Sequence, residues 1–212
     1  MSNDKEANVY ERLWKLYVMI GKMIMDGVRD PQKVAEVLQS IVSEKVGEAK
    51  VYLRWISVTP LAATVPESLE SAREVFKSRF DANFEKWGVD FSETALAMDI
   101  SGDELVHDGK FYEFLGNTAE ELERRRVLGS QLVKFCREHS DDKDDTLRKG
   151  GIANFFVLTK GKSQPVKKDL SNVLVASVFI YGVGNLTVSL YRFNSSVFWG
   201  SANRQRTFSP QP

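Results

Sequence analysis

Three runs of β-forming residues in the last third of the chain place the tightest limit on its fold. Residues 152–160, 172–181 and 185–193 are rich in valine, leucine and phenylalanine, and glycine-containing connections separate them. Short apolar runs bounded by turn residues are typical of β-strands. The tract GVGN between the last two runs suits a tight hairpin with antiparallel strands. The middle run is apolar on both faces, so we expect it to be the central strand.

Earlier segments show helical spacing of apolar residues. Residues 8–28 and about 31–45 each carry an apolar stripe with three- and four-residue spacing, and residues 66–87 carry a stripe rich in phenylalanine. We expect a helix in each segment, and we expect the phenylalanine stripe to be core. Residues 49–59 are β-branched and aromatic, and they predict a strand that ends at Pro60.

Residues 116–140 give the clearest helix signal. Thr118 and Glu121 have the spacing of a capping box, and Arg137 lies near the other end, where a cation suits the helix dipole. The stretch 114–140 also resembles helices of uncharacterised bacterial proteins. This resemblance covers about a third of the chain at most, implies a bacterial origin, and brings no activity with it.

Together these patterns predict an α+β fold. We expect an acidic, mainly helical part, residues 1–145, packed with a small C-terminal antiparallel sheet in a basic part, residues 146–212. The two parts should form one compact domain.

Charge is distributed unevenly between these parts. Residues 1–145 carry 20 lysines and arginines against 28 acids, a net charge of −8, whereas residues 146–212 carry nine against one, a net charge of +8. Such asymmetry is a pointer to nucleic acid or another anionic partner. An acidic part and a basic part that face each other would explain it equally well.

Composition indicates a soluble protein. Hydrophobic residues make up 42% of the 212, and the longest apolar stretch, Leu13 to Met25, is interrupted by Lys15 and Lys22. It is too short and too charged to span a bilayer. The first ten residues lack the apolar core of a signal peptide. The single cysteine, Cys136, fits a reducing compartment, so we expect a cytoplasmic protein that does not contact membranes.

The basic part offers the best candidate binding surface. Cations interleaved with exposed aromatic rings on a sheet suit single-stranded nucleic acid, because bases stack on rings while lysine and arginine neutralise phosphates. The candidate residues for binding nucleic acid or another anion are Lys160, Lys162, Lys167, Lys168, Tyr191, Arg192, Arg204 and Arg206.

Acids in the segment 99–108 form an alternative site, for a metal. The calcium-loop pattern requires glycine at its sixth position and glutamate at its twelfth, and this segment has Glu104 and Lys110 there. We therefore expect a surface turn with solvated acids. If a metal did bind, its ligands would be Asp99, Asp103, His107 and Asp108.

Known catalytic signatures are missing from the sequence. It has no G-x-S-x-G elbow and no phosphate-binding glycine loop, and Cys136 with His139 supplies too few ligands for zinc. We therefore expect a binding protein without enzymatic activity or cofactor, whose partner is nucleic acid or an acidic protein surface. One alternative is a small enzyme or metal-binding protein that uses residues 99–108 with His107. The other is a structural subunit of an assembly.

Overall fold

The computed structural model describes residues 51–212, except for 142–144, 163, 183–184 and 212. The chain divides into two units, Met1–Lys50 and Val51–Pro212. The helices expected over 8–28 and about 31–45 lie outside the described residues, and everything below concerns the second unit. The boundary expected at residue 145 falls inside this unit.

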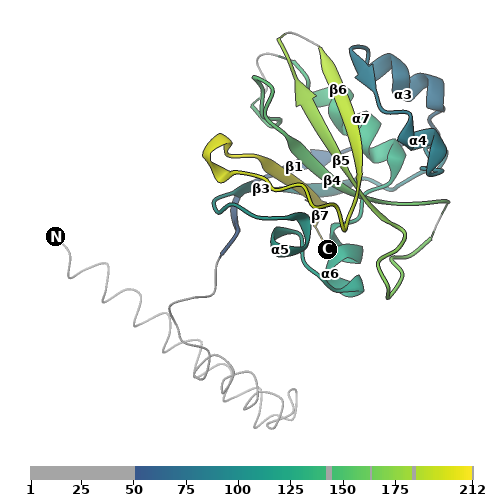
Figure 1. Ribbon diagram of the computed structural model, residues 1–212. Helices are drawn as coiled ribbons and strands as arrows, with labels where there is room; N and C mark the ends of the chain where they lie inside the picture. Colours follow the sequence, from purple (N-terminus) through teal and green to yellow (C-terminus); the bar gives the residue numbers. More distant parts are fainter. Residues whose placement is uncertain (1–50, 142–144, 163, 183–184, 212) are drawn as a thin grey trace, which may run out of the picture. The chain divides into compact units, whose positions relative to one another are not determined.

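A mixed sheet of seven strands forms the centre of the unit (Figure 1). Its order is β1-β3-β7-β4-β5-β6-β2, and only the pairs β4–β7 and β2–β6 are parallel. The strands are β1 (Leu53–Leu61), β2 (Arg79–Phe80), β3 (Met98–Leu105), β4 (Asn154–Thr159), β5 (Val173–Ile180), β6 (Leu186–Arg192) and β7 (Arg206–Pro210).

Five α-helices in the described residues cover the sheet. They are α3 (Leu69–Val75), α4 (Asn83–Lys86), α5 (Phe111–Phe114), α6 (Ala119–Arg125) and α7 (Gly129–His139), and a 3-10 turn, η1, spans Ser201–Asn203. Figure 1 shows α3, α4 and α7 together on one side of β5 and β6, and α5 and α6 together near β7. Within the part of the chain that the structure describes, no helix is long and apolar enough to cross a membrane.

Each face of the sheet has its own apolar core. Successive side chains of a strand point to opposite faces. Phe156 and Leu158 of β4 therefore join the cluster that contains residues of α3, α4 and α7, which we call the α7 face. Phe155 and Val157 join the cluster that contains residues of α5 and α6, which we call the α6 face.

The expected fold class is wrong. The sheet is neither small nor confined to residues 146–212, because β1, β2 and β3 come from the acidic part. It is mixed rather than antiparallel, because β4 pairs with β7 and β2 pairs with β6 in parallel. The strands expected over 152–160, 172–181 and 185–193 are confirmed as β4, β5 and β6, with β5 between the other two. We missed β3 because its sequence, MDISGDEL, is rich in residues that strands usually avoid.

The helix expected over 66–87 is also wrong as a single element. The chain forms α3, then the short strand β2, then α4. Asp81 fixes this break, because its Oδ1 accepts the backbone N–H of Asn83 and its Oδ2 accepts that of Leu190, each at 2.9 Å. The phenylalanine stripe nevertheless forms core as expected, since Phe76 and Phe84 are buried.

The helix expected over 116–140 is interrupted in the same way. Its capping box is confirmed, because Thr118 and Glu121 cap each other at the start of α6. After α6 the chain is extended, and the backbone N–H of Val127 donates to the carbonyl oxygen of Val157 at 2.9 Å. The next helix, α7, then starts at Gly129, where a Cβ atom would lie 2.4 Å from the carbonyl oxygen of Asp90.

We predict that Gly129→Ala destabilises the protein by about 1–3 kcal/mol, the usual cost of forcing extra atoms into a packed interior. Backbone, which yields little, stands in the way of the new methyl group. Urea unfolding measures the change. Gly200→Ala is the matched control, because nothing lies within 4 Å of a Cβ there and its φ is −88°. Equal unfolding midpoints for the two variants would contradict the close approach.

Candidate functional site

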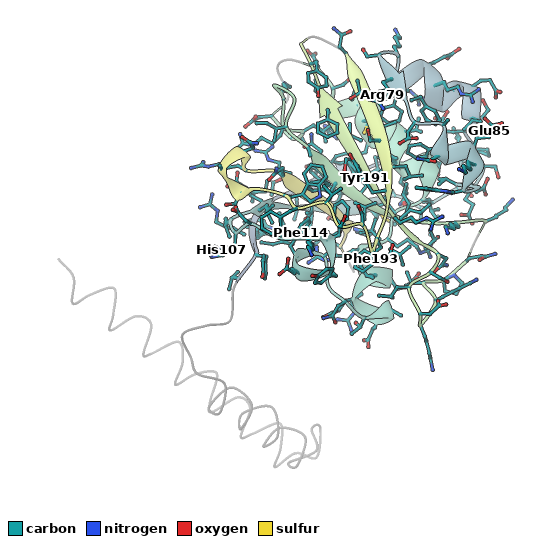
Figure 2. The ribbon with its side chains drawn as sticks, in the orientation of Figure 1. Arg79, Glu85, His107, Phe114, Tyr191 and Phe193 are labelled. Carbon is teal, nitrogen blue, oxygen red and sulfur yellow. The ribbon has the colours of Figure 1, made fainter. Side chains whose placement is uncertain are left out.

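A hollow of about 350 Å³ lies where the connection between β4 and β5 meets the end of β6 and helix α5. We call it the basic hollow, and its lining includes Tyr112, Lys160, Asp169, Leu170, Ser171 and Arg192. Buried Phe193 also lines it and joins it to the core of the α6 face. Figure 2 shows Phe193 near Phe114 and Tyr191, which belong to the same cluster.

Strand ends place the two cations of the basic hollow. Lys160 follows β4 directly, and its Nζ donates to the carbonyl oxygen of Ser171 at 3.1 Å. Arg192 is the last residue of β6, and its guanidinium lies 5.5 Å from the centroid of the Trp87 ring. Neither side chain forms an ion pair within the described residues, so both charges remain available to a ligand.

Buried Asn172 shapes the loop that borders the basic hollow. Its side chain accepts the backbone N–H of Lys167 and donates to the carbonyl oxygen of Pro165, each at 2.9 Å. Beside it, Leu170 has φ +57°, a left-handed conformation that costs a non-glycine residue roughly 1–2 kcal/mol. The loop therefore has a defined shape, and its strained residue, Leu170, lines the hollow.

Asp169 lies in the same wall and stays ionised. Hydrogen bonds from the hydroxyl and the backbone N–H of Ser171 hold the pKa of this carboxyl below its usual value. The carboxylate is thus engaged with its own loop. It reduces the positive charge of the hollow but leaves a net excess of cations, since Lys160 and Arg192 both line it.

Tyr112 supplies an exposed ring at the basic hollow. Its neighbours Phe111 and Phe114 are buried and anchor helix α5 to the α6 face, which leaves Tyr112 outward with 43% of its surface exposed. The Nζ of Lys110 lies 5.8 Å from the centroid of its ring. Tyr112 was not among the predicted binding residues, although the spacing of the two phenylalanines in FYEF would have placed it on the outer side of a helix turn.

The structure gathers only some of the residues predicted to bind anions. Lys162, Lys167 and Lys168 are exposed in the loop between β4 and β5, beside Lys160 and the hollow. Tyr191 instead packs into the core, 6.0 Å from the ring of Phe111 and 5.9 Å from that of Trp199.

The two remaining predicted cations lie elsewhere. Arg206 pairs with Asn154 at the start of β4, whereas Lys160 follows the end of that strand, so the two cations lie at opposite ends of β4. Arg204 is exposed, just before β7. Arg206 is buried, and its Nη1 donates to the carbonyl oxygens of Asp145 and Thr146. This arginine is engaged inside the fold.

Buried Glu104 shows where the acidic and basic parts neutralise each other. Its carboxylate accepts hydrogen bonds from Arg54 at 2.5 Å and from Arg148 at 2.9 Å, and only 4% of its side chain is exposed. Burial alone would raise the pKa of Glu104, but the hydrogen bonds from the two arginines outweigh it and lower the pKa. Pairing inside the fold therefore explains part of the charge asymmetry. It does not explain the lysines around the basic hollow.

The residues predicted as alternative metal ligands are dispersed. Asp99 and Asp103 lie in strand β3, so the expected surface turn is wrong, and Asp103 pairs with Arg125 at 3.6 Å. Asp108 accepts hydrogen bonds from the backbone N–H and the hydroxyl of Ser201. His107 is exposed, and Figure 2 shows it well apart from Phe193, which lines the basic hollow. Among the described residues, no group of three or more histidines, cysteines or acids could hold a metal ion.

Cys136 has the environment of a core residue rather than of a nucleophile. It is fully buried in helix α7, and burial raises the pKa of its thiol far above the usual value. A reactive cysteine requires the opposite shift, because the thiolate is the nucleophile. The ring of His139 packs against Phe135, with 4.6 Å between centroids.

Comparisons with known protein families, with curated proteins and with solved structures found no match. The basic hollow is therefore assigned from its geometry and charge.

We predict that Glu104→Gln lowers the free energy of unfolding at neutral pH by about 1.5–3 kcal/mol, the usual worth of hydrogen bonds to a charged group. Because the folded-state pKa of Glu104 is lowered, its contribution is present above the unfolded pKa of about 4.3 and is lost as pH falls through the folded pKa. Urea unfolding at several pH values should show the difference from the unmodified protein shrinking in acid.

Glu120→Gln is the control for this measurement, because Glu120 forms an exposed ion pair with Arg124. Pairs of that kind contribute little to stability, so this variant should unfold like the unmodified protein at every pH. A pH-independent effect of Glu104→Gln would show that its carboxylate charge is unimportant.

Proposed function

We propose that the protein binds single-stranded nucleic acid at the basic hollow. One observation carries this proposal: two cations without ion-pair partners in the described residues, Lys160 and Arg192, line a hollow together with the exposed ring of Tyr112. A cationic groove tracks the phosphate backbone, and an aromatic ring offers a platform for an unpaired base.

The charge around the hollow suits a chain of phosphates better than one small anion. Five cations lie in its lining and in the loop beside it, and Asp169 is the one acid among residues 146–212. The cations are Lys160, Lys162, Lys167, Lys168 and Arg192. Several spaced cations neutralise several phosphates, and the release of their counterions supplies binding free energy that falls as salt increases.

Single strands are favoured over a duplex because of Tyr112. Its ring is exposed on the short helix α5, and stacking on a ring requires a base that is free of its partner. Within the described residues, the cations around the basic hollow lie in a loop and at strand ends rather than on a helix that could enter a major groove.

We expect a labelled oligothymidine to bind the full chain, and its fluorescence anisotropy to report a steep loss of affinity between about 50 and 200 mM salt. The double variant Lys167→Glu/Lys168→Glu should weaken binding and lower the slope of log affinity against log salt by about one for each lysine.

Lys77→Glu/Arg79→Glu is the matched control, because it makes the same change in net charge at exposed cations in and just before β2, away from Phe193 of the hollow in Figure 2. It should bind like the unmodified protein. Equal weakening by the two double variants, or no binding at about 50 mM salt, would contradict the proposal, because phosphate-driven binding is strongest at low salt.

Tyr112→Ala should weaken oligothymidine binding by about 1–3 kcal/mol, the contribution of one base stacked on an aromatic side chain. Tyr112→Phe keeps the ring and should bind normally. Anisotropy titrations of the two variants measure the contribution of stacking. Displacement of the oligonucleotide by inorganic polyphosphate, which has no bases, measures the contribution of charge. If Tyr112→Ala bound as tightly as the unmodified protein, the ligand would be recognised by charge alone.

A further inference from the structure

A second hollow, of about 380 Å³, lies on the α6 face between helix α6 and the neighbouring strands β3 and β7. We call it the α6 groove. The lining residues that matter here are Ser101 and Asp103 of β3, Ser209 of β7, and Glu121, Arg124 and Arg125 of α6. None of them lines the basic hollow, so the two sites are separate.

Pairing of β3 with β7 aligns polar side chains under this groove. Ser101 lies opposite Ser209, and Asp103 lies opposite Thr207. The three hydroxyl residues are buried: 4% of Ser101, 9% of Ser209 and 1% of Thr207 is exposed. The neighbouring strand β4 presents Phe155 and Val157 on the same face, so the face changes from apolar to polar beneath α6. Strand propensity accounts for threonine but gives no reason for the serines.

Part of the hydrogen-bonding capacity in and beneath the groove is unused, although Glu121 caps α6 and Arg124 pairs with Glu120. Within the described residues, the buried hydroxyl of Thr207 has no hydrogen-bond partner, and leaving such a group unpaired costs about 1–3 kcal/mol. Asp103 and Arg125 approach only to 3.6 Å, which is an ion pair but too long for a good hydrogen bond. Only 26% of the Arg125 side chain is exposed, so this arginine lies against the wall of the groove, where its N–H donors can reach a bound ligand.

The charges of the groove select a neutral ligand. Two acids, Asp103 and Glu121, face two arginines of the lining, and Arg124 also pairs with Glu120, so the groove has no excess of cations, in contrast to the basic hollow. A neutral molecule that both donates and accepts hydrogen bonds would satisfy the carboxylate, the guanidinium and the serine hydroxyls together. Adjacent hydroxyl groups do this, and the volume falls at the small end of the roughly 300–1,000 Å³ typical of ligand pockets.

We infer that the α6 groove binds a neutral sugar of one or two rings. Asp103 accepts hydrogen bonds from the sugar hydroxyls, Arg125 donates to their oxygens, and Ser101 and Ser209 do both. The part of the lining named here contains no aromatic ring, so hydrogen bonds carry the affinity, and exchange between free and bound sugar is fast.

Saturation-transfer difference NMR on the full chain tests this inference, because it detects weak ligands in fast exchange. The probes are the methyl glycosides of glucose, galactose, mannose and N-acetylglucosamine, each measured alone. We expect a signal from at least one glycoside, loss of that signal in Ser101→Ala/Ser209→Ala, and its retention in Ser196→Ala, which removes an exposed hydroxyl. Arg125→Lys should weaken it several-fold, because it keeps the charge but loses the planar fork of donors.

Thermal melting of each variant confirms that it is folded, and Arg125→Lys serves as the test if the double serine variant unfolds. The inference is overturned if none of the four glycosides gives a signal, or if the signal survives in folded variants of the groove. It is also overturned if inorganic phosphate displaces the glycoside, since an anion would then be the preferred ligand. None of these results depends on oligonucleotide binding at the basic hollow.

Discussion

The insertion of β7 between β3 and β4 is the constraint on which the rest of this fold depends. β3 and β4 do not pair with each other, and β7 bonds to both, antiparallel to the first and parallel to the second. Its Phe208 stacks on Phe156 at 5.1 Å and lies next to Gly102, where a Cβ would come within 3.3 Å of the phenylalanine ring. This one strand of five residues therefore unites the antiparallel pair β1–β3 with the meander formed by β4, β5 and β6.

The meander could be predicted from the sequence because its strands are short apolar runs bounded by turn residues. β3 and β7 could not, because their stability comes from partners far along the chain. Glu104 is tolerated in a buried strand only because Arg148, 44 residues away, and Arg54 reach its carboxylate. Local spacing likewise predicted one helix where there are two, since nothing near Gly129 in sequence reveals that the carbonyl of Asp90 lies against it.

The candidate site shows the same division. Lys160, Arg192 and the lysines between them could be predicted, because residues 146–212 contain a large excess of lysine and arginine over acids. The sequence does not show that Arg206 differs from these cations. The sheet register places Arg206 opposite Glu104, and its side chain is buried. Tyr112 was missed because it lies outside the basic segment, and only the packing of α5 brings it to the hollow.

The position of β7 in the sheet also affects how the chain can fold as it leaves the ribosome. Until residues 206–210 have emerged, β3 and β4 each present an unpaired edge, and the two parts of the sheet have no strand between them. Exposed strand edges are templates for pairing with other chains. Closure of the sheet must therefore follow synthesis of nearly all of the unit, and the interval before β7 arrives is when a nascent chain is most exposed to aggregation and to chaperones.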